Sequence, residues 1–439
     1  MAKRVVIIGG GFAGLAAGVG VSERGHQVWL LERRNRLGGR AYSFIDAKTG
    51  DVVDNGQHLF MGCYRHTIAF LARIGRLDRL KFQARPHVDF LDRNGFASFD
   101  CPALPAPLHV LAGLLRMRGI GLVDKLRAFN VGRAIKGNGK LSPGTRTVDQ
   151  WLSELGQSAR IKKRFWYPMV VATLNQSPDI ASARMLKVVL QEAFGGEAKS
   201  ASIGISRVGL SDLYTDGAAD YIKARGGDVQ TGAQVRRLVI ERGLVTGVEL
   251  KDGERIDGDF FISAVPPEAL FAILPDNQTL KEFSQLAKLG SSPIVSINLW
   301  FDRSIIDREF VGLLGTKSQW IFNKDLILKP GKRSNQVAVI ISAARDFVDW
   351  TKNDLVEMAI GELRELLPVS RSAELLHSVI VKEREATLSH SVESDSPRPG
   401  PKTSIPNLIL AGDWTDTGLP ATIESAVMSG DIAAQIVGD

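Results

Sequence analysis

The pattern of apolar and polar positions begins with a short β-branched run that ends in glycines. Residues 4–8 form this run, which is typical of a buried parallel strand. Residues 14–24 follow as a predicted helix that Gly25 ends, and residues 27–31 form a second buried strand that leads to Glu32. A strand, a helix and a second strand in this order predict the start of an α/β domain with a parallel sheet.

Further along the chain, helical and alternating segments succeed one another. Residues 103–115 are uncharged and mostly apolar, and short helices are expected over residues 147–155 and 181–191. Apolar and polar residues alternate over residues 227–256, which predicts a meander of strands. Further strands are expected over residues 259–265, 293–301, 336–342 and 407–410, and a closing helix over residues 422–436.

Composition places the chain among ordinary globular proteins, because 44% of its 439 residues are hydrophobic and 23% are charged. Cys63 and Cys101 cannot build a disulfide framework, and we expect both to be reduced in a cytoplasmic protein. The scattered histidines show no metal-ligand spacing, so no metal is expected. The apolar run at residues 5–20 resembles a signal peptide, but its glycines fall at phosphate-loop spacing and exclude that interpretation.

Charge is concentrated in one segment of the chain. The net charge is +7, and residues 116–140 alone carry seven basic residues and one acidic residue, a net +6. Such a block is either a solvated face or a binding surface for an anionic partner. Nucleic acid is not expected, since Phe129 is the one aromatic residue in this segment and the segment has no recognised binding motif. The charged residues are Arg116, Arg118, Lys125, Arg127, Arg133, Lys136 and Lys140, with Asp124.

The first chemical motif is Gly9-Gly10-Gly11-Phe12-Ala13-Gly14, which joins the first strand to the first helix. Gly9 permits a tight turn, Gly11 lets backbone N–H groups approach a pyrophosphate, and Gly14 lets helix and strand pack closely. Glu32 follows eighteen residues later, where a carboxylate can accept both ribose hydroxyls. This context predicts a dinucleotide site, and the Glu32 charge disfavours the 2′-phosphate of NADP.

A second motif, Leu37-Gly38-Gly39-Arg40, again allows close backbone approach and offers a guanidinium to phosphate. Together with Glu32-Arg33-Arg34 it resembles the FAD signature of the amine oxidase and phytoene desaturase superfamily. Residues 411–415, 421–426 and 429–430 resemble that superfamily's second flavin motif. The resemblance implies that Asp413 bonds the ribityl–pyrophosphate region and that the start of the closing helix lies beside the flavin ring. No cysteine lies near this motif, so FAD is expected to be non-covalent.

Four further segments resemble one branch, the squalene-associated FAD-dependent desaturases of hopanoid synthesis, now understood as hydroxysqualene dehydroxylases. These segments are residues 53–58, residues 165–168 with 172–175, residues 312–315 and residues 411–426. The resemblance covers essentially the whole chain. We expect Trp166 to be a core residue rather than a pocket wall. His58, in a glycine-containing loop, is either a structural histidine or a functional one.

The motifs and the resemblance together define the candidate site. We expect FAD to be bound by Gly9, Gly11, Phe12, Ala13, Gly14, Glu32, Arg33, Gly38, Gly39, Arg40, Gly56, Gln57, Val235, Gly412, Asp413, Thr422 and Ile423. The candidate catalytic residues, chosen by position, are His58, Asp413 and Glu424.

The predicted fold is a discontinuous Rossmann-like α/β FAD domain with an inserted mixed α+β substrate domain. Residues 1–60, 205–285 and 400–439 are assigned to the FAD domain, because the last strand and helix resemble the first unit. Residues 61–204 and 286–399 are assigned to the substrate and membrane-facing domain.

The resemblance implies conversion of hydroxysqualene, a C30 isoprenoid, to squalene, with reduced FAD as hydride donor and an unidentified external electron donor. Three alternatives stay open: a carotenoid-type desaturase, a flavin amine oxidase, and a flavin-carrying binding protein without turnover. A C30 substrate must be collected from a bilayer. The apolar residues 103–115 beside the basic block therefore predict peripheral association with the inner face of the cell membrane.

Overall fold

Five parallel strands form the first sheet of the computed structural model, which describes residues 1–137, 142–275, 283, 286, 289–328, 334–394 and 398–438. The strand order brings the two ends of the chain together. The first strand of the chain lies at the centre of the sheet, and the last strand lies at one edge. The predicted α/β class is confirmed. In spatial order the strands are β10 (Asp228–Thr231), β2 (Gln27–Glu32), β1 (Arg4–Ile8), β14 (Phe260–Ser263) and β20 (Leu408–Leu410).

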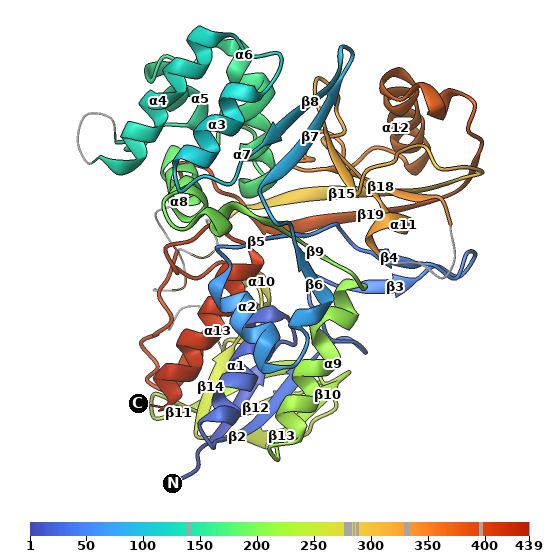
Figure 1. The fold of residues 1–439 in the computed structure, drawn as a ribbon. Coiled ribbons are helices and arrows are strands. Elements are labelled where there is room, and N and C mark those ends of the chain that lie inside the picture. Colours follow the sequence, from blue (N-terminus) through green and yellow to red (C-terminus); the bar gives the residue numbers. More distant parts are fainter. Residues whose placement is uncertain are drawn as a thin grey trace.

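Helices cover one face of this sheet and a strand meander covers the other. Val5 and Ile7 pack against the helices, whereas Val6 and Ile8 pack against the meander, because side chains alternate across a strand. Both termini lie at this end of the molecule (Figure 1). The helices are α1 (Phe12–Glu23), α2 (Arg65–Arg73), α9 (Leu210–Lys223) and α13 (Ile423–Gly438). The other face carries β11 (Val235–Glu241), β12 (Leu244–Leu250), β13 (Arg255–Asp257) and α10 (Pro267–Ile273).

The predicted meander over residues 227–256 is wrong for its first strand. Strand β10 joins the edge of the parallel sheet beside β2, and only β11, β12 and β13 form the meander. Gly232, whose φ is +75°, lies between β10 and β11, where the chain leaves the parallel sheet. Residues 228–231 do form a strand, as the alternation predicts, but alternation alone does not show which sheet a strand joins.

A second, seven-stranded sheet crosses the middle of the molecule (Figure 1). Val337 and Val339 face α12 (Lys352–Leu366), whereas Ala338 and Ile340 face the other way, toward a group of helices. In order the strands are β19 (Leu375–Leu388), β15 (Ser291–Phe301), β18 (Gln336–Ile341), β17 (Trp320–Asn323), β16 (Phe310–Leu313), β7 (His87–Asp92) and β8 (Gly95–Asp100). Small pairings of β3 (Ser43–Ile45) with β4 (Val52–Asp54), and of β9 (Ile203–Ser206) with β5 (Leu59–Met61) and β6 (Leu80–Phe82), lie between the two sheets.

The group of helices lies at the end opposite to the termini (Figure 1). Trp166 is only 6% exposed there, and its Nε1 donates a hydrogen bond of 2.9 Å to Gln157 Oε1, so the prediction that it is a core residue is confirmed. The helices are α3 (Leu108–Arg116), α4 (Leu122–Lys136), α5 (Val148–Glu154), α6 (Ala159–Ile161), a π-helical turn (Lys162–Trp166), α7 (Tyr167–Leu174) and α8 (Ala183–Phe194).

One buried ion pair links the loop after β4 to the second sheet. Lys324, which begins α11 (Lys324–Ile327), is 2% exposed, and its Nζ lies 2.7 Å from Asp54 Oδ2 and 2.9 Å from Gln57 Oε1. Burial alone would raise the pKa of Asp54, but the Lys324 ammonium and the hydrogen bonds from Ser43 and Leu210 together outweigh burial, and the pKa is lowered. Lys324 and Asp54 therefore both stay charged, and each charge is stabilised by the other.

Replacing Lys324 by methionine should lower the free energy of unfolding by about 3–5 kcal/mol, because the Asp54 carboxylate is then buried without its partner. Urea titration followed by circular dichroism measures the change. Arg384→Met is the matched control, since Arg384 and Asp349 form an exposed pair that contributes at most about 1 kcal/mol. Equal losses in the two variants would contradict the assigned role of Lys324.

Candidate active site

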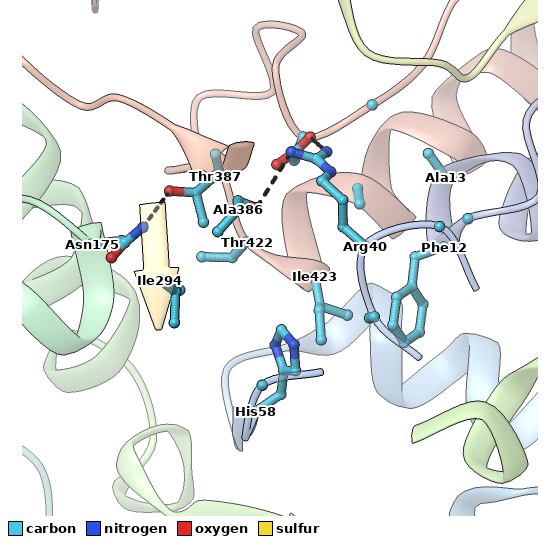
Figure 2. Close-up of a pocket in the computed structure, with 18 of the residues that line it drawn as sticks. Phe12, Ala13, Arg40, His58, Asn175, Ile294, Ala386, Thr387, Thr422 and Ile423 are labelled. Carbon is cyan, nitrogen blue, oxygen red and sulfur yellow. Dashed lines mark hydrogen bonds and ion pairs between the residues drawn. The ribbon is translucent and has the colours of Figure 1, made fainter. Parts of the chain in front are cut away.

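A cavity of about 730 Å³ lies between the two sheets and is lined by residues from both. Phe12 and Ala13 lie on one side of it, and Asn175, Ile294 and Thr387 lie on the other (Figure 2). His58, Arg40, Thr422 and Ile423 lie between these two groups. Every residue predicted to bind FAD lines this cavity except Gly14.

Gly14 has a different position because it packs behind the glycine loop. A Cβ atom there would lie 1.9 Å from the carbonyl oxygen of Gly9, which no side chain can tolerate. Gly14 therefore sets the close approach of α1 to β1, as predicted, without facing the cavity.

The glycine loop presents unbonded N–H groups to the cavity. The backbone N–H groups of Gly11, Phe12 and Ala13 form no hydrogen bond with any described residue. No acidic residue lies in the first turn of α1. A helix N-terminus of this kind attracts an anion such as a pyrophosphate. Around Gly11 the nearest atom to an added Cβ is Gly39 Cα at 3.8 Å, so the space beside it is open.

Glu32 ends β2 at the wall of the cavity and is 5% exposed. Its Oε2 accepts a hydrogen bond of 2.8 Å from the Gly10 N–H, and its Oε1 accepts one of 2.9 Å from the Arg34 N–H. Each carboxylate oxygen keeps lone pairs for further donors, so the position suits a ribose diol.

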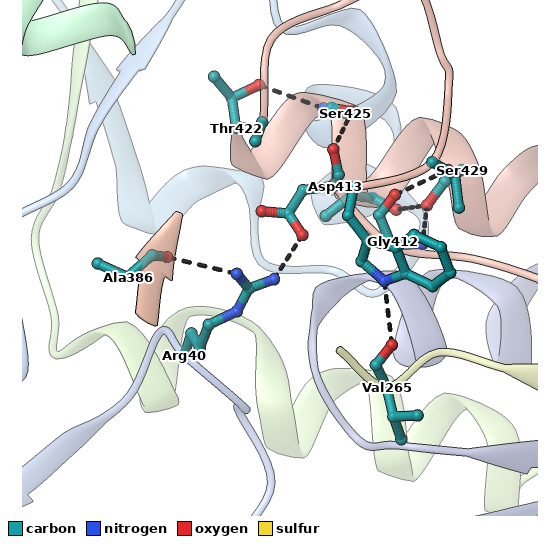
Figure 3. Close-up of polar contacts among 12 residues, drawn as sticks. Arg40, Val265, Ala386, Gly412, Asp413, Thr422, Ser425 and Ser429 are labelled. Carbon is teal, nitrogen blue, oxygen red and sulfur yellow. Dashed lines mark hydrogen bonds and ion pairs between the residues drawn. The ribbon is translucent and has the colours of Figure 1, made fainter. Parts of the chain in front are cut away.

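Arg40 and Asp413 form an ion pair that joins the first and last flavin motifs (Figure 3). Arg40 also donates a hydrogen bond of 3.4 Å to the Ala386 carbonyl oxygen. Burial opposes the charge of Arg40, but Asp413, with smaller contributions from Glu268 and Glu383, outweighs burial, and the pKa of Arg40 is raised. The sequence predicted a guanidinium for phosphate, and the structure adds the carboxylate that positions it.

Backbone contacts hold the segment around Asp413 in place. The Gly412 N–H donates a hydrogen bond of 2.8 Å to Ser429 Oγ, and Trp414 Nε1 donates one of 3.0 Å to the Val265 carbonyl oxygen (Figure 3). Gly412 has a φ of +147°, which favours glycine. Thr422 caps α13, since its Oγ1 accepts a hydrogen bond from the Ser425 N–H.

His58 projects from the loop before β5 toward Ile423 (Figure 2). No described residue forms a hydrogen bond with its ring, although the ring lines the cavity. Burial lowers the pKa of His58, and the carboxylates of Asp54 and Glu383 offset the effect only in part. A half-buried imidazole whose two nitrogens have no hydrogen-bond partner in the described part of the chain is suited to a ligand contact.

Glu424 does not belong to the cavity wall, which corrects its selection as a catalytic candidate by position. It is 5% exposed, and its oxygens accept hydrogen bonds from the N–H groups of His66 and Thr67 at 2.8 and 2.9 Å. Thr67 Oγ1 donates a third hydrogen bond at 2.7 Å. Glu424 therefore caps the N-terminus of α2, a role that links two distant segments and leaves no local sequence signal.

Beyond the glycine loop, the cavity wall becomes apolar. This part is built by β7 and β8, by the sheet strands β15, β17 and β18, and by the helices α7 and α8. Apart from Phe165, which lies in the segment 165–168, these residues stand in no sequence motif, and none of them was predicted to line the site. They include Val88, Phe90, Phe99, Phe165, Met169, Val189, Phe194, Ile294, Trp320, Phe322 and Ile340.

The polar groups at the edge of this apolar part are bonded to one another. Asn175, which ends α7 with a φ of 48°, donates hydrogen bonds of 3.0 Å to the Ser292 carbonyl oxygen and to Thr387 Oγ1. Its Oδ1 accepts a hydrogen bond of 2.7 Å from the Ala343 N–H. The amide thus closes a strained turn without leaving an unpaired polar group in the wall.

Cys63 and Cys101 are both unpaired and buried, and neither lines the cavity. Burial raises the pKa of each thiol to about 12. Within the described ranges no group of three or more His, Cys, Asp or Glu side chains could hold a metal ion. No helix in the described part of the chain is long and apolar enough to cross a membrane.

A model of flavin containing amine oxidoreductases matches residues 12–438. The chain belongs to this family. Family membership agrees with the glycine loop, with Glu32 and with the joined flavin motifs, and it establishes the protein as an FAD-dependent oxidoreductase. The lining of the cavity suits FAD, because it combines N–H groups that no described residue bonds, the Glu32 carboxylate and the Arg40 guanidinium.

Similar curated proteins include hydroxysqualene dehydroxylases and 15-cis-phytoene desaturases. A hydroxysqualene dehydroxylase from Rhodopseudomonas palustris is 30% identical over 100% of this chain and 99% of its own length. Another from Zymomonas mobilis is 28% identical over 98% of both chains. A 15-cis-phytoene desaturase from Arabidopsis thaliana is 26% identical over 99% of this chain and 80% of its own.

Solved structures confirm the fold. An oxidoreductase from Methanosarcina mazei superposes with a TM-score of 0.76 at 17% identity and covers 98% of this chain and 100% of its own. A reduced UDP-galactopyranose mutase superposes with a TM-score of 0.72 at 14% identity, over 99% of this chain and 95% of its own.

Replacing Gly11 by valine should abolish FAD binding while the chain still folds, because the side chain enters the open space beside the unbonded N–H groups. Flavin absorbance of the purified protein and its circular dichroism spectrum measure the two properties. Gly361→Val is the matched control, since Gly361 in α12 also has open space and lies far from the cavity lining. A folded Gly11 variant that retains FAD would refute the assignment of the pyrophosphate site.

Proposed function

We propose that this flavoenzyme removes the hydroxyl group of hydroxysqualene reductively and releases squalene. The observation that carries the proposal is the apolar part of the cavity, which opens directly from the flavin site. Each methylene group that leaves water for such a wall contributes about 0.8 kcal/mol, so a C30 chain gains much of its binding energy from contacts of this kind. The name and coverage of the dehydroxylase relatives support the choice of substrate.

The net reaction replaces one C–O bond of the substrate by a C–H bond and releases one water molecule. Reduced FAD, when bound, supplies the hydride, and it ends the reaction oxidised. The chain has to hold the reacting carbon at the flavin, deliver a proton to the departing hydroxyl, and exclude other water from the allylic cation. The apolar wall formed by Phe90, Trp320, Phe322 and their neighbours serves the last of these requirements.

His58 is the proposed proton donor to the hydroxyl group. It lies where the flavin site meets the apolar wall, and its ring has no partner among the described residues. A lowered pKa makes the protonated imidazole a stronger acid. Asp413 is a weaker candidate because its carboxylate is already bound to Arg40.

Oxidative desaturation of an isoprenoid is the second candidate function. The 15-cis-phytoene desaturase relatives cover nearly the whole chain, and the same apolar wall would accept a polyene. The two functions differ in the direction in which electrons flow, and this difference separates them experimentally.

Enzyme reduced with dithionite should convert hydroxysqualene to squalene without oxygen, with one flavin reoxidised for each product molecule. Absorbance follows the flavin, and mass spectrometry identifies the product. Oxidised enzyme should not desaturate phytoene or squalene at a rate comparable to that of the dehydroxylation. Desaturated products from the oxidised enzyme would favour the second function, and no turnover in either direction would leave a flavin-binding protein.

Replacing His58 by glutamine should lower kcat by about 10²–10⁴, the usual contribution of a general acid, with FAD content unchanged. Since burial lowers the pKa of His58, the wild-type rate should rise as pH falls below the ordinary histidine value of about 6.5 and level off once the ring is protonated. The rate of the glutamine variant should not follow this pH dependence. A variant that is slow but keeps the wild-type pH profile would show that His58 has a structural role.

A further inference from the structure

The surface of α3 and α4 exposes an unusual number of large apolar side chains. Of the fifteen that are strongly exposed among the described residues, seven lie between Leu104 and Phe129. Single exposed apolar residues are normal on a protein surface, whereas a cluster indicates a binding surface. The seven are Leu104, Leu108, Leu115, Leu122, Val123, Leu126 and Phe129, and we call them the apolar face.

The apolar face is distinct from the side of α4 that packs against the protein. Ala128, Val131 and Ala134 are buried and small, and they recur at three-residue spacing. Leu122 and Leu126 are 68% and 55% exposed, and with Phe129 they recur at the spacing of one helix face. Helix α4 therefore has its larger apolar residues outside and its smaller ones inside, the reverse of the order that folding alone requires.

Basic residues lie in the same segment as the apolar face, and most of them are exposed. Residues 103–137 contain six basic side chains and one acidic one, Asp124. The basic ones are Arg116, Arg118, Lys125, Arg127, Arg133 and Lys136; Lys140, which the sequence grouped with them, lies outside the described residues. Apolar side chains that insert between cations are the pattern of an interfacial membrane contact.

The apolar face also lies over the apolar end of the cavity. Helix α3 packs on β8, where a Cβ added at Gly113 would lie 3.1 Å from Phe99 Cε2, and Phe99 lines the cavity. Helix α4 contacts α8, whose Val189 and Phe194 line the cavity as well. Helices α3 and α4 therefore pack directly on elements that line the apolar end of the cavity.

We propose that the apolar face docks on an anionic lipid bilayer, with the basic residues against the headgroups. Association with a second copy of the chain is disfavoured, because a two-fold contact through this face would bring two sets of like charges together. The contact goes beyond the proposed reaction and does not rest on the identity of the substrate.

Flotation of the holoenzyme with vesicles tests the docking proposal and requires no turnover. A failure of the docking proposal can therefore be distinguished from a failure of the proposed function. Wild type should bind vesicles of equal parts phosphatidylglycerol and phosphatidylcholine, bind less in high salt, and not bind pure phosphatidylcholine. The variant L122S/L126S/F129S and the variant R116Q/R118Q/R127Q/R133Q should each bind about tenfold more weakly or worse, with FAD content unchanged.

Matched controls change the same numbers of exposed residues elsewhere. Sites for the apolar control, L244S/V369S/L376S, are 44%, 55% and 54% exposed, and the charge control is K223Q/K352Q/R371Q/R384Q. Both controls should float like wild type. The proposal is overturned if the face variants float like wild type, if the controls lose binding equally, or if sedimentation shows a wild-type dimer that L122S/L126S/F129S converts to monomer without any change in lipid binding.

Discussion

Backbone contact around α1 is the constraint on which the site depends. The absence of side chains at Gly14 and Gly430 lets α1 approach both β1 and α13, since added Cβ atoms would lie 1.9 Å from Gly9 O and 2.3 Å from Ala13 O. This packing fixes the N-terminus of α1 at the cavity with three N–H groups unbonded. Backbone dipoles at this helix end are therefore already oriented to bind an anion such as a pyrophosphate without rearrangement.

The same constraint brings the two ends of the chain to one place. Because α13 packs on α1, the segment before α13 lies beside the loop that carries Arg40, and Asp413 reaches it across 373 positions of sequence. The pair lies within the cavity wall, so the first and last flavin motifs form one surface. A cofactor that contacts both motifs therefore also holds the two ends of the chain together.

Sequence reasoning succeeded where a property depends on consecutive residues. The glycine loop, Glu32 and the flavin motifs are local patterns with a physical reason for each residue, and the structure brings sixteen of the seventeen residues together around one cavity. That these residues bind FAD stays a prediction. Sequence reasoning failed where the partner is distant. Glu424 was chosen for its place in a motif, yet its carboxylate is bound to His66 and Thr67 of another segment. Strand β10 alternates like its neighbours but pairs with β2, and the apolar wall draws single residues from many elements.

Burial of charge and exposure of apolar surface mark the places where this chain departs from the arrangement that folding alone favours. The Lys324–Asp54 pair costs desolvation, but through Gln57 it holds the loop that carries His58 at the cavity. The exposed leucines of α4 leave apolar surface in water, which is less favourable than a polar surface would be. They lie over the apolar end of the same cavity. Both costs are understandable if the substrate is the proposed isoprenoid alcohol, whose hydrocarbon chain must pass from a lipid phase to the flavin without crossing water. On this view the apolar face, the apolar wall and the polar loop at His58 are successive parts of one path, and the only polar step on it is the one at which the hydroxyl group leaves.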